Sequence, residues 1–156
     1  MRLYHTSTMI VEQPDTIHSR KYLDFGQGFY LTPIHEQAVR YAERFKRRQR
    51  PAWLNVYDLP DQLNGWKILR FEAYDESWLD FVSVCRAGED SSDYDMVVGG
   101  IANDRVILTL DRYFAREISQ GEALGLLKFE KPNLQYCIRS EEMLRECLTF
   151  IESKEL

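Results

Sequence analysis

The segment D-F-G-Q-G-F-Y-L-T, residues 24–32, holds the most informative arrangement of side chains in the chain. Gly26 and Gly28 flank a glutamine and make a tight bend without Cβ atoms, which lets a ligand approach the backbone closely. Phe29 and Tyr30 follow on a predicted strand, where successive side chains point to opposite faces. One ring can therefore enter a pocket while the other enters the core. The two glycines precede a strand and lack a third, so they do not form a dinucleotide-binding fingerprint.

Two further side chains near the N-terminus have chemistry to offer. His5 ends a short predicted strand, where it can bind a ligand hydroxyl or serve as a core histidine satisfied by a backbone carbonyl. Arg20 precedes the glycine bend and can reach a pyrophosphate through two parallel hydrogen bonds, or form a surface ion pair. The position of these two residues in the sequence does not show which of the roles each one has.

Three pieces of sequence together resemble the NAD-binding half of the poly(ADP-ribose) polymerase and diphtheria-toxin branch of ADP-ribosyltransferases. They are L-Y-H-T-S at residues 3–7, G-Q-G-F-Y at residues 26–30, and Tyr41 eleven residues later. The resemblance implies that His5 bonds the adenosine ribose and that the backbone of Thr6 holds the nicotinamide amide. It also implies that Tyr30 and Tyr41 lie against the two faces of the nicotinamide.

The third catalytic position of that branch lies on a late strand, and its best match is Gln135 in N-L-Q-Y-C-I. Many active members carry Glu there, and Gln has no negative charge to stabilise a cationic ribose. Gln135 also has an interpretation without chemistry, as a partner for a neighbouring strand's backbone. The resemblance thus gives catalytic roles to His5, Tyr30 and Gln135, and NAD contacts to His5, Thr6, Arg20, Gly28, Tyr30 and Tyr41.

The whole chain also resembles an uncharacterised bacterial family assigned to this fold. The residues that carry this likeness are S-R-K-Y-L-D-F-G-Q-G-F-Y-L-T, D-Y-D-M-V-V-G-G-I-A-N-D and K-P-N-L-Q-Y. It implies a toxin-like enzyme that transfers ADP-ribose from NAD to an acceptor, and a small antitoxin-like protein partner. The acceptor stays open between protein, nucleic acid, a small molecule and water. NAD hydrolysis and a non-catalytic module that binds NAD, ADP-ribose or a protein are the alternatives.

The composition favours a soluble cytoplasmic protein. The net charge of −5 argues against wholesale wrapping by nucleic acid or docking on anionic lipid. An odd count of three cysteines fits reduced, buried thiols better than a disulfide framework. No metal is expected, because the histidines have no companions at ligand spacing and the acidic run at residues 89–95 is best explained as a solvated loop. No segment has the apolar length of a signal peptide or membrane span.

The elements that must position these residues form one α+β domain over residues 1–156, with an ADP-ribosyltransferase-like split sheet and flanking helices. Strands and helices mix without the regular alternation of a doubly wound sheet. The predicted strands cover residues 2–5, 28–32, 53–59, 66–71, 96–98 and 134–138. Helices are predicted after Thr32, which serves as a cap, after Asp75, between 106 and 129 with a break near Gly121, and from Ser140 through Ile151. Tyr41 lies on the apolar stripe of the first helix and has an alternative role as a core residue.

Overall fold

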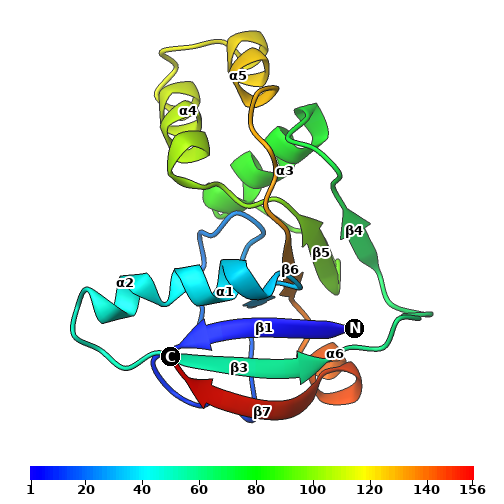
Figure 1. Cartoon of the computed structure of the whole chain (residues 1–156). Coiled ribbons are helices and arrows are strands. Elements are labelled where there is room, and N and C mark those ends of the chain that lie inside the picture. The colour runs from blue at the N-terminus through cyan, green and yellow to red at the C-terminus, as the bar shows by residue number, and fades with distance from the viewer.

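The strands of the computed structural model, which describes residues 1–156, form two sheets (Figure 1). The first is antiparallel in the order β1-β3-β7, with β1 at Arg2–Ser7, β3 at Trp53–Asp58 and β7 at Thr149–Glu155. The second has the order β2-β6-β5-β4, with strands at Phe29–Leu31, Gln135–Ile138, Met96–Gly99 and Ile68–Arg70. Only β4 and β5 run parallel. The predicted α+β class is confirmed.

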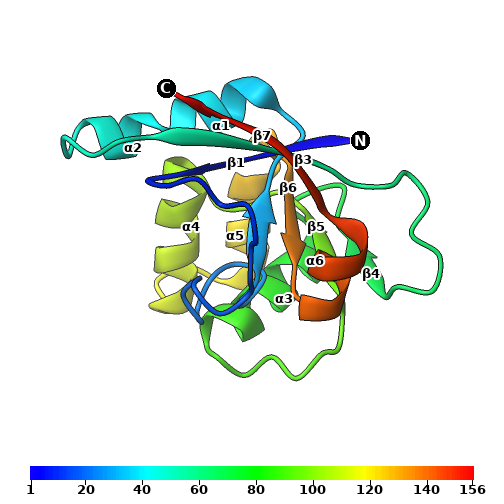
Figure 2. The same ribbon diagram turned by 90° about the horizontal axis from the view of Figure 1, so that it is seen from below.

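Helices cover the outer faces of the two sheets, which gives four layers (Figure 2). On the first sheet, Ala38 of α1 packs against Leu54 and Val56 of β3. On the second, α3, α4 and α5 share one apolar cluster with Val97 of β5 and Cys137 of β6. The helices are α1 His35–Tyr41, α2 Glu43–Lys46, α3 Glu76–Arg86, α4 Asp104–Phe114, α5 Gln120–Leu127 and α6 Glu141–Cys147. None of them combines the length and apolar character needed to cross a membrane.

The space between the sheets is filled by alternate residues of the facing strands. Leu3 and Tyr57 of the first sheet share a buried cluster with Phe29 and Leu31 of β2. Because side chains alternate along a strand, Tyr30 points the other way, into the cluster formed with α3 to α5. The predicted division of the two rings between opposite faces of β2 is confirmed.

The two sheets meet at a single bridge between β1 and β2. The N–H of Tyr4 donates to the carbonyl of Thr32 at 2.8 Å, and the N–H of Thr32 donates to the carbonyl of Tyr4 at 2.9 Å. The ladder between β1 and β2 stops there, so His5–Ser7 of β1 and Phe29–Leu31 of β2 do not pair with each other, although each pairs with its other neighbour, β3 or β6. We call the place where these two stretches part the β1–β2 split.

The C-terminal end differs from the sequence-based prediction. Helix α6 begins after the predicted cap Ser140, whose hydroxyl accepts from the N–H of Met143 at 3.2 Å, but it ends at Cys147. The prediction of helix through Ile151 is wrong, because Thr149–Glu155 instead pairs with the open edge of β3. Hydrogen bonds along that edge outweigh the helical spacing of the apolar residues.

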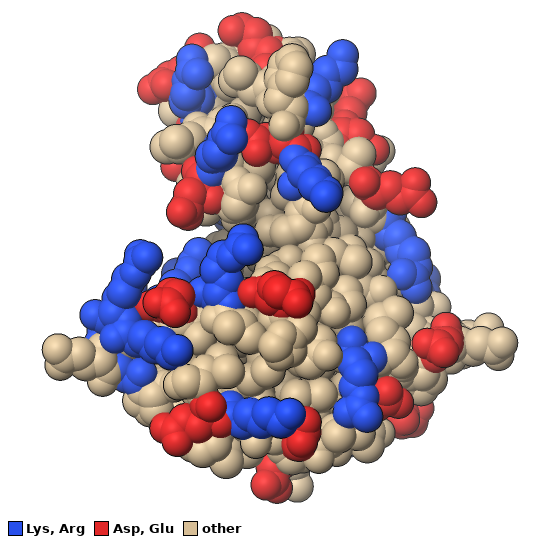
Figure 3. Space-filling model, viewed as in Figure 1, with Lys and Arg blue, Asp and Glu red and all other residues tan.

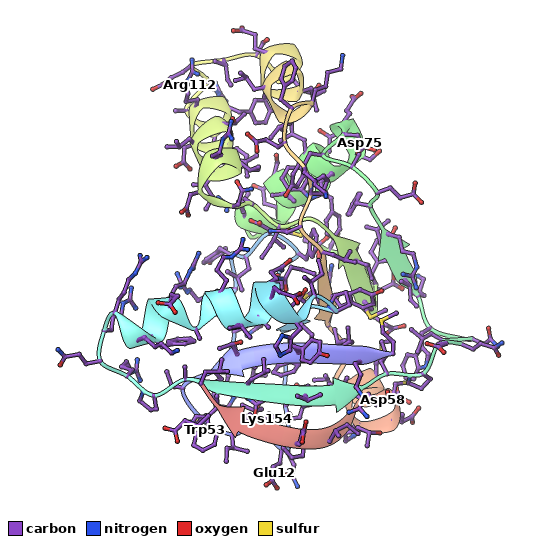
Figure 4. The ribbon with its side chains drawn as sticks, viewed as in Figure 1. Glu12, Trp53, Asp58, Asp75, Arg112 and Lys154 are labelled. Carbon is purple, nitrogen blue, oxygen red and sulfur yellow. The ribbon has the colours of Figure 1, made fainter.

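One other local prediction needs correction. Thr32 does not cap α1, because the helix begins at His35; its hydroxyl accepts from the N–H of Ile34 at 3.1 Å and shapes the turn before the helix. The two strands predicted at residues 53–59 and 66–71 form as β3 and β4, which belong to different sheets. The break between α4 and α5 lies at residues 115–119, just before Gly121. By contrast, Asp75 caps α3 as predicted, accepting from Trp78 N–H at 2.9 Å (Figure 4).

Candidate functional site

The structure brings the side chain of His5 to the backbone of Tyr30 across the β1–β2 split, while the Tyr30 ring lies on the opposite face of β2 from the Phe29 ring that His5 contacts. Residues two apart on a strand point their backbone groups the same way, so the carbonyl of Tyr30 faces β1, as that of Thr32 does. At Thr32 this direction ends in the bridge to Tyr4. At Tyr30 no backbone partner follows, and His5 Nδ1 donates to the carbonyl at 2.7 Å. The imidazole therefore supplies the hydrogen bond that a backbone N–H of β1 would supply if the two strands stayed paired.

This hydrogen bond fixes the chemical state of His5. A carbonyl only accepts, so Nδ1 must carry the proton and Nε2 of a neutral ring is left as an acceptor. Burial lowers the pKa of His5 below its ordinary 6.5, and the bond to Tyr30 opposes this only in part. The ring also packs on Phe29, with 4.4 Å between ring centroids. His5 is thus a neutral, half-buried side chain whose Nε2 makes no hydrogen bond within the protein.

The side chain of Tyr30 closes the glycine bend. Its hydroxyl donates to the carbonyl of Gly26 at 2.6 Å and accepts from the N–H of Phe25 at 3.1 Å. Burial raises the pKa of the Tyr30 phenol well above its ordinary value of 10, so the donor is retained at all physiological pH. The hydroxyl is therefore fully used inside the protein, and only the half-buried ring is left to contact a ligand.

The close approach that Gly28 permits is made by the protein itself. A Cβ at this position would lie 2.6 Å from Cys137 Sγ and 2.7 Å from the carbonyl oxygen of Ile138 on β6. The N–H of Gly28 is held by the hydroxyl of Ser19 at 3.0 Å. Arg20, the next residue, is exposed beside the bend and makes no ion pair.

Helix α1 packs beside β1, the first strand of the β1–β2 split. The hydroxyl of Thr6 donates to the carbonyl of Ala38 at 2.6 Å, and Thr6 is buried. Tyr41 lies about one turn further along and is 45% exposed, so the alternative that it is a core residue is wrong. Its aromatic partner is Phe45, with ring centroids 5.7 Å apart, rather than Tyr30.

Gln135 lies on the same face of the second sheet as Tyr30. Tyr30 pairs with Cys137 across β2 and β6, and Gln135 is two residues from Cys137, so its side chain points to the same side. It is half-buried and makes no side-chain hydrogen bond, so the alternative of pairing with a neighbouring strand is not realised. Beside it, the side chain of Gln37 on α1 grips the backbone of Leu134 through two hydrogen bonds of 3.3 and 3.4 Å.

The surface of the molecule is hollowed above α1 and α2. Figure 3 shows a depression between the lobe of α4 and α5 and the part of the molecule that carries α1 and α2. Lys and Arg side chains border this depression. A separate open cavity of about 480 Å³ lies elsewhere, between the bend at Gly26 and Gln27 and the loop at residues 88–95. None of the residues predicted to catalyse the reaction lines that cavity.

Comparison with known protein families gives a match that extends over residues 1–150 and is described as a protein of unknown function, DUF3990. The chain belongs to the DUF3990 family. No curated protein and no solved structure matches it. The matched range runs from the start of β1 into β7, so it contains every candidate residue of the DUF3990 domain.

Sequence reasoning missed a buried asparagine that supports His5. Asn55 pairs with His5 in the register of β1 and β3 and is fully buried. Its Nδ2 donates to the carbonyls of His5 at 3.3 Å and Met9 at 3.2 Å, and its Oδ1 accepts from Val11 N–H at 2.9 Å. These bonds fix the chain as it leaves β1. The available signal was a single amide in the otherwise apolar run W-L-N-V-Y.

A second missed residue, Asp24, anchors the glycine bend of the DUF3990 domain. Its buried carboxylate accepts from Arg86 Nε at 2.7 Å and from the N–H of Ala102 at 2.6 Å. The bend that holds the Tyr30 hydroxyl is thereby tied to the end of α3 and to the segment before α4. A buried carboxylate that lost either partner would destabilise the bend strongly.

The acidic run at residues 89–95 is not a purely solvated loop. The half-buried Asp90 pairs with Arg139 at 2.5 Å, and this ion pair with the hydroxyl of Ser92 lowers the pKa of the Asp90 carboxyl against the effect of burial. The exposed Asp93 pairs with Lys67 at 2.6 Å. No group of three or more His, Cys, Asp or Glu side chains is arranged to hold a metal ion. All three cysteines are free, and Cys85 and Cys137 are buried.

Proposed function

We propose that the DUF3990 domain binds NAD at the β1–β2 split and acts as an ADP-ribosyltransferase. The observation that carries this proposal is the hydrogen bond from His5 to the Tyr30 carbonyl, at the point where the pairing between the two sheets stops after a single bridge. The split-sheet arrangement expected of the ADP-ribosyltransferase fold requires such a break between the strands that bear these two residues. Thr6, the residue after His5, bonds the carbonyl of Ala38 on α1, the helix that ends at the third aromatic side chain, Tyr41.

In this proposal, each side chain performs one task. Neutral His5 accepts a hydrogen bond from a ribose hydroxyl at Nε2, because Nδ1 is committed to the Tyr30 carbonyl. The ring of Tyr30 lies against the nicotinamide, and Tyr41 on α1 covers its other face. Thr6 holds the amide through its backbone, and Arg20 reaches the pyrophosphate beside the bend at Gly28.

The reaction breaks the bond between the nicotinamide nitrogen and C1′ of the ribose. The bonding electron pair leaves with nicotinamide, and an acceptor nucleophile forms the new bond at C1′ and loses its proton. Holding the leaving group between two rings fixes the geometry of attack. Gln135, which shares a sheet face with Tyr30, grips the ribose hydroxyls but adds no charge to stabilise the cationic ribose.

The absence of that charge gives weight to two rival functions. NAD hydrolysis needs the same pocket with water as the acceptor, and a non-catalytic module needs only binding. Gln135 favours the slower or non-catalytic alternatives, because several kcal/mol of transition-state stabilisation can come from one well-placed charge. The Nε2 of His5, which makes no hydrogen bond within the protein, is the feature that favours a ligand site over a purely structural domain.

Incubation of the pure protein with labelled NAD, with and without cell lysate, separates these functions. Label on macromolecules is the expected result, free ADP-ribose alone indicates hydrolysis, and intact NAD refutes the proposal. Gln135→Ala tests the site, because this side chain makes no hydrogen bond within the protein and its loss should cost little stability. Gln62→Ala, at an exposed position in the turn after β3, is the matched control and should keep full activity.

A further inference from the structure

One segment of the chain carries a charge opposite to the rest. The segment 40–50, which we call the basic segment, contains six basic side chains and one acidic side chain, Glu43. Its net charge is therefore +5, and the remaining residues must carry −10 to give the overall −5. The basic members are Arg40, Arg44, Lys46, Arg47, Arg48 and Arg50.

These six side chains are not neutralised within the protein. All are exposed, and none takes part in any of the nine ion pairs of the structure. Figure 3 shows Lys and Arg gathered over α1 and α2. The helix dipole favours cations only within the last turn, and residues 47–50 lie beyond the end of α2. No ion pair with a carboxylate of the chain therefore offsets the mutual repulsion of these six cations.

Aromatic rings are interleaved with this charge. The guanidinium of Arg44 lies 4.9 Å from the centroid of the Tyr41 ring, and that ring is 45% exposed. Phe45 packs edge-on against Tyr41 and holds it in place. Exposed rings beside arginines form the stacking platforms on which unpaired bases lie, while guanidinium groups bond phosphate through two parallel hydrogen bonds.

The basic segment begins at the candidate site. Ala38, one turn before Tyr41, accepts the hydroxyl hydrogen bond of Thr6, the residue after His5. A ligand lying along α1 and α2 therefore runs from the positive surface toward the β1–β2 split.

We infer that the basic segment docks single-stranded nucleic acid and presents it to the split as the acceptor, an inference that rests on the proposed ADP-ribosyl transfer. A base nitrogen or a hydroxyl of the strand forms the bond to C1′ and releases its proton to solvent, while nicotinamide leaves with the bonding pair. A duplex hides the faces of its bases, so an unpaired strand fits the exposed ring better. RNA and single-stranded DNA share the recognised chemistry.

Fluorescence anisotropy tests the docking without NAD. The probes are labelled RNA and DNA strands of about 20 nucleotides, a length above typical single-strand site sizes, together with a DNA duplex of the same sequence. Each phosphate contact adds about 0.7 to the slope of log affinity against log salt, so about five contacts weaken binding roughly 100-fold between about 50 and 200 mM salt.

The test variant is Arg44→Gln, Arg47→Gln and Arg48→Gln in one chain. It should lower the salt slope by about 2 and weaken binding at least tenfold. The matched control loses the same charge from three exposed, unpaired arginines on other elements: Arg2→Gln, Arg70→Gln and Arg145→Gln. Both variants have a net charge of −8, three below the −5 of the parent, so a difference between them reports position and not total charge. Without NAD, Tyr41→Ala should weaken strand binding several-fold without changing the salt slope, because the ring that covers the nicotinamide when NAD is bound is then open to a base.

Competition binding with other polyanions and a transfer assay with labelled NAD complete the experiment. Equal weakening in the two triple variants, or preference for a polyglutamate peptide or phosphatidylserine vesicles, overturns the inference. Label from NAD recovered on the strand, and lost in the test variant, supports it. NAD cleavage without any strand binding overturns the inference and leaves the proposed function standing. Strand binding without NAD cleavage refutes the proposed function and leaves the docking surface standing.

Discussion

Replacing His5 by asparagine separates the two tasks that we assign to one imidazole. The Nδ1–H of His5 donates to the Tyr30 carbonyl at 2.7 Å, and Nε2 is the proposed acceptor for a ribose hydroxyl. The amide nitrogen of asparagine is two bonds from Cβ, as Nδ1 is, so it can donate to the same carbonyl. Asparagine has no atom at the position of Nε2. Alanine removes both groups and serves as the comparison.

The structure sets the expected sizes of the two effects. In His5→Ala, the Tyr30 carbonyl loses its partner, which costs about 1–3 kcal/mol, and the ring contact with Phe29 at 4.4 Å is lost as well. A loss of about 2 kcal/mol lowers the melting temperature of a chain of this length by about 4–8 °C. His5→Asn should stay within about 1 kcal/mol of the parent, since the hydrogen bond is kept.

Binding of NAD should respond differently. Both variants lack the Nε2 acceptor, so both should bind NAD about fivefold more weakly, equivalent to about 1 kcal/mol. Isothermal titration calorimetry gives the affinities and differential scanning calorimetry the stabilities. A His5→Asn protein with the parent's affinity for NAD would refute the ribose contact. A His5→Asn protein as unstable as His5→Ala would refute the assigned hydrogen bond.

Four further predictions follow from the same contacts. Because burial lowers the pKa of His5, the unfolded chain takes up a proton there before the folded one, so stability should fall as the pH drops below about 6.5, and His5→Asn should reduce this loss in urea titrations. Tyr30→Phe should lose about 1 kcal/mol of stability with its hydroxyl bonds yet keep NAD affinity in calorimetry, whereas Tyr30→Ala should lose at least about 1 kcal/mol of binding; equal affinities would remove the ring from the site. Gln135→Glu should speed NAD cleavage about tenfold, or about 1.4 kcal/mol, by adding charge on the Tyr30 face, and an unchanged rate in a folded protein that binds NAD would contradict this. Gly28→Ala should destabilise the fold by about 1–3 kcal/mol in thermal melts, because the new Cβ would lie 2.6 Å from Cys137 Sγ; a neutral effect would show that β6 can move aside.

The sequence alone determined the features that depend on neighbouring residues. The cap at Asp75, the cap at Ser140 and the glycine near the end of α3 were predicted and are confirmed, with Gly88 at a φ of +72°. A cap is a hydrogen bond between residues three apart, so its signal lies within a few positions of the chain. The alternation of Phe29 and Tyr30 is equally local, because strand geometry fixes it once a strand forms.

The tertiary structure decided every feature that depends on a distant partner. Ile151 continues the helical spacing of Leu144, Cys147 and Leu148, yet residues 149–155 become β7, because the free edge of β3 offers hydrogen bonds from nearly 100 positions away. His5 could be read from the sequence as a ligand-binding or a core residue; the break in pairing between β1 and β2 gives it the Tyr30 carbonyl on one nitrogen and leaves the other without a partner. Asn55 and Asp24 were missed for the same reason, since their value lies in bonds to backbone groups far along the chain. Pairing edges and buried polar partners are set by how the whole chain packs, and no local pattern of residues encodes them.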